Sequence, residues 1–160
     1  MRKPATLAFV LLLFLSFAMA QGETDVDQLN QKAESLLNQK PRESLTIAET
    51  ARQAAETINY KKGQAKAIAL LGVAHYKIDE YDKARNYITR AEALSQQAAD
   101  TINLAFSKYW LANLELNQGQ YGKALDHYQT ALLLAERIND KRNMARALDG
   151  KATIYEALGE

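Results

Sequence analysis

Few residues of this chain have the types and spacing that catalysis or metal binding requires. His75 and His127 are its only histidines, and neither lies in a metal-binding spacing such as His-Glu-x-x-His. The sequence has no Cys, no glycine-rich phosphate loop and no local motif that joins Ser, His and Asp. We therefore expect no enzyme activity, no metal and no cofactor. We expect His75 to pack between paired helices and His127 to lie at a solvated rim.

One cluster is suited to recognition instead. Phe106, Tyr109 and Trp110 are followed at helical spacing by Asn113 and Asn117. Aromatic rings offer a large contact area, and amides exchange hydrogen bonds with the backbone of a bound peptide. The alternative is that these rings form core between helices, because aromatic stripes at helical spacing are usually buried.

An internal repeat defines the elements that must position this cluster. Residues 61–100 align with residues 101–140 at an offset of forty, which pairs Ala84 with Ala124. An offset of eighty aligns the first half of the chain equally well. The repeat domain, 21–160, therefore divides into units at about 21–60, 61–100, 101–140 and a partial unit at 141–160.

Each unit is predicted to be a helical hairpin. Apolar residues recur at intervals of three and four, and the units break near Pro41, Asp79 and Gly119. Helix formers are abundant, whereas the chain has only seven Gly and two Pro, which argues against a many-stranded sheet. We expect helices at about 24–38, 42–58, 61–77, 81–98, 101–117, 121–138 and 142–158.

The units resemble the tetratricopeptide repeat. The residues that carry the resemblance are Leu71, Gly72, Tyr81, Ala84, Ile88 and Ala91 in one unit and Leu111, Ala112, Tyr121, Ala124, Tyr128 and Ala131 in the next. The units are about six residues longer than the usual thirty-four, and the first keeps only Ser44, Ala48 and Ala51 of the pattern. The resemblance implies an all-α fold, a right-handed superhelical stack of antiparallel helix hairpins with about three and a half repeats.

The resemblance also implies a concave groove that binds a protein or a peptide. The alignment of the units with this repeat implies that the following residues lie on the groove wall: Lys66, Ala69, Val73, Tyr76, Phe106, Tyr109, Asn113, Asn117, Arg146, Asp149 and Thr153. Some family members clamp the terminal carboxylate of a peptide with Lys, Asn and Arg. The corresponding positions here hold Ala69, Val73, Trp110, Arg146 and Gly150, of which only Arg146 fits, so that clamp is not expected.

Residues 1–20 have the composition of a secretory signal peptide. Arg2 and Lys3 precede an apolar run, and Ala18-Met19-Ala20 supplies the small residues that signal peptidase requires. We expect cleavage after Ala20 and an exported, periplasmic or otherwise extracytoplasmic bacterial protein. An uncleaved membrane anchor is the alternative, because the apolar run is only slightly short for a span.

The remaining charge is close to balanced. Without Arg2 and Lys3 the 20 basic residues become 18, against 19 acidic residues, so the net charge is about −1. A protein that binds nucleic acid or an anionic membrane needs clustered basic residues, and pairs such as Lys61-Lys62 have acidic residues nearby. We therefore expect a protein or peptide partner and no nucleic acid.

The last predicted helix has an apolar side that one neighbour does not cover. It carries Met144, Leu148, Tyr155 and Leu158, and repeat arrays normally cap such edges. We expect either the N-terminal part of a longer protein or an imperfect cap. The leading function is an exported interaction scaffold. The alternative is the sensory N-terminal portion of a membrane-bound bacterial histidine kinase or diguanylate cyclase, and an enzyme is a third reading.

Overall fold

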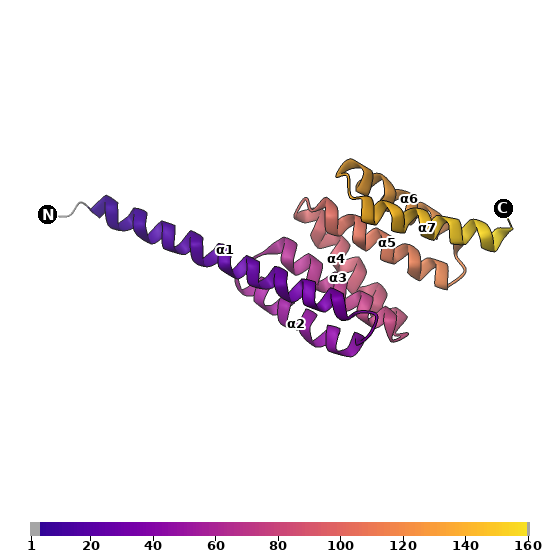
Figure 1. The fold of residues 1–160 in the computed structure, drawn as a ribbon, viewed down its shortest axis with the longest axis horizontal. Helices are drawn as coiled ribbons and strands as arrows, with labels where there is room; N and C mark the ends of the chain where they lie inside the picture. Colours follow the sequence, from indigo (N-terminus) through magenta and orange to yellow (C-terminus); the bar gives the residue numbers. More distant parts are fainter. Residues whose placement is uncertain (1–3, 160) are drawn as a thin grey trace.

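The structure, a computed structural model, describes residues 4–159. Within that range it contains α-helices and no strand (Figure 1). The helices are α1 (Pro4–Leu36), α2 (Pro41–Thr57), α3 (Lys61–Lys77), α4 (Tyr81–Gln97), α5 (Thr101–Asn117), α6 (Tyr121–Arg137) and α7 (Lys141–Leu158). Consecutive helices pack as antiparallel pairs, so the predicted all-α stack of hairpins is confirmed.

The predicted helix ends agree with the structure to within about two residues, except at the start of α1. We predicted a start near residue 24, but α1 begins at Pro4 and continues through Ala20, the predicted cleavage position. The helix is continuous because the residues between carry no proline and only one glycine, Gly22, which lowers helix stability without ending a helix. Among the described residues, no helix has the length and apolar character of a membrane span.

The helices after α1 begin at intervals of twenty residues, and a short turn of fixed geometry sets that interval. Each of the five turns between α2 and α7 holds one residue in the left-handed region, with φ between 50° and 70°: Asn59, Asp79, Ala99, Gly119 and Asn139. The amide of the following residue donates to a carbonyl five residues back, as in Asp100 N to Ser95 O at 2.8 Å. This is the Schellman arrangement, which pairs the last carbonyls of a helix. Three residues therefore suffice to reverse the chain.

Two of these turns also cap the helix that follows them. The Asp100 carboxylate accepts from the backbone amide of Asn103 at 3.1 Å, and Asp140 does the same for Asn143. Each of these carboxylates also accepts from the Asn side chain at 2.6 Å. Because such caps pair amides that lack an intrahelical partner, they fix where α5 and α7 begin.

The helices form two layers. Within the described residues, α1, α3, α5 and α7 contact one another in sequence, whereas α2, α4 and α6 contact only helices of the first layer. A stack whose inner members touch and whose outer members are spread apart must curve toward the inner layer. Consistent with that curvature, Arg142 of α7 lies 3.6 Å from the carboxylate of Glu34 in α1. We call the surface enclosed by α1, α3, α5 and α7 the inner groove.

Small residues allow paired helices to approach closely. Ala84, Ala91, Ala124 and Ala131 are all fully buried. A Cβ atom on Gly72 would lie 2.5 Å from Ile88 and 3.1 Å from the backbone oxygen of Ala84, closer than real Cβ contacts allow. The predicted role of these positions, which is to remove side chains where helices cross, is thus confirmed.

We predict that Ala124→Leu lowers the free energy of unfolding by about 1–3 kcal/mol, because three carbon atoms are added where Ala112 and Tyr128 already fill the space. Lys123→Leu is the matched control, since residue 123 is exposed on the same helix. Urea unfolding followed by circular dichroism measures both. Equal stability of the two variants would contradict the packing described above.

We predict that Ala99→Gly raises the free energy of unfolding by about 0.5–1 kcal/mol. Ala99 is exposed and has a φ of 50°, where a Cβ is unfavourable and glycine is not. The neighbouring Ala98 has φ −83°, so Ala98→Gly should destabilise the chain instead. Thermal unfolding measures both variants. A lower midpoint for both would contradict the strain that we attribute to the left-handed conformation of Ala99.

Candidate partner-binding groove

The helices of the inner layer carry the residues that the sequence placed on a groove wall. Asn117, Asp149 and Thr153 are exposed. Half-buried members are Lys66, Tyr76, Tyr109, Asn113 and Arg146. Val73 is fully buried and Phe106 is 3% exposed, so these two support the wall from beneath and present almost no surface. Ala69 is likewise buried.

The aromatic cluster is continuous and centres on Trp110. Its ring lies 5.3 Å from Tyr76, 6.3 Å from Phe106 and 5.4 Å from Tyr109, measured between centroids, and all three pairs meet edge to face. Edge-to-face pairs at these separations are favourable beyond the area that they bury. Phe106 therefore belongs to the core, whereas Tyr109 and Trp110 each keep one part exposed.

Asn113 provides the polar group beside these rings. Its side-chain nitrogen donates to the backbone oxygen of Tyr109 at 2.8 Å, which fixes the orientation of the amide. Among the described residues its side-chain oxygen accepts no hydrogen bond, so this oxygen is available to a donor from outside the chain. An oriented acceptor next to aromatic surface is suited to the backbone N–H of an extended peptide.

A charged cluster lies at another part of the inner groove. One carboxylate oxygen of Glu34 is 2.9 Å from the ammonium of Lys66, and the other is 3.6 Å from Arg142. The Lys66 ammonium also lies 4.1 Å from the centroid of the Phe106 ring, within cation–π range. The groove thus joins charged and aromatic groups from α1, α3, α5 and α7.

The pKa values of this cluster follow from its burial and its charges. Burial opposes ionisation of Glu34, but Lys66, Arg142 and Arg146 together outweigh it and lower the pKa of that carboxyl. Burial lowers the pKa of the Lys66 ammonium, with Arg146 and Arg142 acting in the same direction and Glu34 opposing them. Sequence reasoning identified Lys66 and Arg146 but missed Glu34 and Arg142, which lie more than one hundred residues apart and meet only in the curved stack.

The two histidines lie outside this groove wall. The His75 ring stacks on Tyr87 at 5.2 Å, and its Nδ1 is 2.6 Å from the Glu80 carboxylate, so the predicted packing between paired helices is confirmed. His127 is half-buried, and burial together with Lys108 lowers its pKa. The described residues contain no group of three or more His, Cys, Asp or Glu placed to hold a metal ion.

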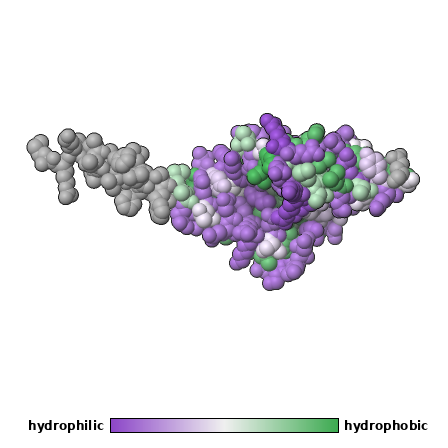
Figure 2. All heavy atoms as spheres, turned by 45° about the horizontal axis from the view of Figure 1, so that its top comes forward, coloured by the Kyte–Doolittle hydropathy of each residue, from purple (hydrophilic) through white to green (hydrophobic). Residues whose placement is uncertain are grey.

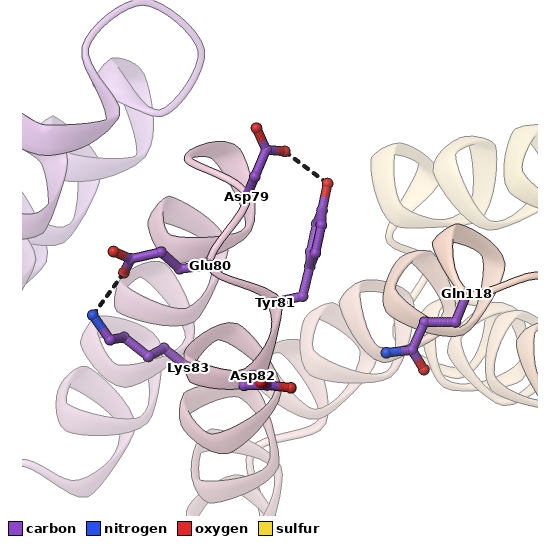
Figure 3. Close-up of a pocket in the computed structure, with 6 residues that line it drawn as sticks. All are labelled: Asp79, Glu80, Tyr81, Asp82, Lys83 and Gln118. Carbon is purple, nitrogen blue, oxygen red and sulfur yellow. Dashed lines mark hydrogen bonds and ion pairs between the residues drawn. The ribbon is translucent and has the colours of Figure 1, made fainter.

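Apart from the inner groove, a hollow lies at the turn between α3 and α4. Its lining includes one residue that follows α5. Figure 3 shows Tyr81 directed toward Asp79, with Gln118 on the other side of the hollow, just after the end of α5. The Tyr81 hydroxyl donates to Asp79 at 2.7 Å, and Lys83 pairs with Glu80 at 3.0 Å. Four of its six residues thus pair with one another, and Gln118 accepts hydrogen bonds from Arg85 and Gln120.

Comparison with known proteins agrees with this geometry. Residues 103–160 match the family model described as tetratricopeptide repeat. The seven helices described above are consistent with repeats of the same kind over the rest of the chain. No curated protein matches the sequence. Tetratricopeptide repeats typically act as scaffolds for protein–protein interaction and typically catalyse nothing.

We predict that Glu34→Gln lowers stability by about 1–2 kcal/mol at pH 7, because it leaves the half-buried Lys66 without its counter-ion. The folded pKa of Glu34 lies below its ordinary value of 4.5, so its stabilising effect is present above that value and is lost as the pH falls through the folded pKa. The difference between wild type and variant should therefore shrink as the pH falls below 4.5 and through the folded pKa.

The matched control is Glu43→Gln, which breaks an exposed pair between the first turn of α2 and its N-cap residue, Lys40. Exposed pairs contribute little, so this variant should unfold close to wild type. Urea unfolding at several pH values measures both variants. A constant difference for Glu34→Gln between pH 3 and pH 7 would contradict the role given to its ionised form.

Proposed function

We propose that this chain is an exported, non-catalytic scaffold that binds a protein or peptide partner along the inner groove. The observation that carries the proposal is the half-buried wall of Tyr109, Trp110 and Asn113 in the inner layer. Half-exposed rings beside an oriented amide give a partner both contact area and a hydrogen-bond acceptor. An extended peptide fits this chemistry, because its backbone supplies donors at regular intervals.

The export part of the proposal rests on residues 1–20 of the sequence. Their basic start, apolar run and small residues before Gln21 are those of a secretory signal. We predict that the protein recovered from a bacterial periplasm begins at Gln21, as read by intact mass. Replacing Ala20 by Lys should block this cleavage. Recovery of the unprocessed chain from the cytoplasm would refute export.

The alternative function is the sensory N-terminal portion of a membrane-bound histidine kinase or diguanylate cyclase. It is supported by apolar side chains on α7, where Leu148, Tyr155 and Leu158 are 51%, 39% and 48% exposed. Figure 2 shows hydrophobic residues gathered toward the right of the view, the side on which Figure 1 shows α6 and α7. Such a surface is suited to contact with a further helix or with another protein.

The groove proposal is tested by peptide selection. We predict that a displayed peptide library enriches binders on the wild-type chain and that Thr153→Arg reduces their binding at least tenfold, because a long charged side chain obstructs the groove. Thr50→Arg on α2 is the matched control, since both threonines are exposed and donate to the carbonyl four residues earlier. Equal loss in the two variants, or binders unaffected by either, would refute the groove.

A further inference from the structure

The charged end of the inner groove holds more cations than its one carboxylate requires. Lys66, Arg142 and Arg146 all act on Glu34, and each of them lowers the pKa of that carboxyl. Lys66 comes from α3, both arginines come from α7, and Glu34 comes from α1. Three positive groups from two helices thus surround a single negative group, which leaves an excess of positive charge.

The two arginines are less engaged than Lys66. The Arg142 side chain is 68% exposed, and its 3.6 Å contact with Glu34 is longer than a charge-assisted hydrogen bond. Arg146 is half-buried and donates to the amide oxygen of Asn143 at 3.3 Å, and it has no ion pair among the described residues. A guanidinium group pairs best with a carboxylate through two parallel hydrogen bonds, and neither arginine has such a pair here.

We propose that Arg142 and Arg146, with Lys66 behind them, form a binding site for the carboxylate side chains of an acidic peptide. The inference rests on the proposed function and gives the chemical class of its partner. Glu34 shows that the position between these cations accepts a carboxylate. An acidic residue of the partner binds the exposed faces of the arginines, while its neighbouring residues contact the wall around Tyr109 and Asn113.

The charge of the site favours an acidic peptide over a nucleic acid. The excess is local, because the chain beyond residue 20 carries about as many acidic as basic residues. A nucleic acid needs cations along an extended phosphate backbone, whereas one or two carboxylates need only a few converging cations. Phe106, the ring nearest to Lys66, is buried and so presents no face for a stacked base.

The experiment measures binding of a fluorescein-labelled peptide of alternating Glu and Leu by anisotropy, with the same peptide carrying Gln in place of Glu as reference. We expect the Glu peptide to bind at least tenfold more tightly. Arg142→Gln and Arg146→Gln should each weaken it three- to tenfold, and Glu34→Gln should strengthen it by removing a competing carboxylate. Raising the salt from 50 to 300 mM should weaken it, because mobile ions screen exposed charges.

The matched control is Lys123→Gln, which removes an exposed cation from α6 and should leave binding unchanged. Circular dichroism confirms that every variant is folded. Equal binding of the Glu and Gln peptides would overturn the proposal, as would unaltered binding by both arginine variants or tighter binding of a labelled oligothymidylate. If selected library peptides lose binding with Thr153→Arg and not with the arginine variants, the groove stands and the acidic partner is refuted.

Discussion

The left-handed residue that follows each of the helices α2 to α6 is the constraint on which the rest of this structure depends. It allows consecutive helices to be joined by three residues, whereas the connection from α1 to α2, which has no such residue, takes four. With it, each turn pairs the last carbonyls of one helix and aims the next helix back along the first. At four of the five turns this conformation is adopted by Gly, Asn or Asp, which tolerate it with little strain. At the fifth turn it is adopted by Ala99, for which it is unfavourable.

The regular turns have a consequence at longer range. Because each hairpin has the same length, alanines and glycine recur at the helix crossings, and the first helices of successive hairpins pack on one another. The resulting curvature brings α7 to within an ion pair of α1. The groove and its charged end thus depend on a repeated local geometry. A change at one turn would disturb residues far from it in sequence.

Much of the fold could be predicted from the sequence because each repeat unit is specified by residues close together in the chain. The forty-residue offset, the spacing of apolar residues, and Pro41 and Gly119 placed six of the seven helices to within two residues. The start of α1 could not be placed, since a signal-like apolar run and a helix have the same composition. Asp100 and Asp140 are aligned by the same offset, and the structure shows that both cap the helix that follows them.

The candidate site was harder to predict for a physical reason. Register identified helix faces, but whether a side chain on such a face is buried depends on the neighbouring helix, which is why Val73 and Phe106 lie beneath the surface while Asn113 lies on it. The contact between Glu34 and Arg142 depends on how each of three successive hairpins is oriented relative to the one before. No pattern within a single unit predicts that combined curvature.

The central claim, that partners bind along the inner layer, is tested most directly by nuclear magnetic resonance. Amide chemical shifts of the chain are recorded while a selected peptide is added. The account predicts shifts at Asn113, Arg146 and Thr153 and little change on the outer faces of α2, α4 and α6. Shifts confined to those outer helices, with the inner layer unchanged, would contradict it.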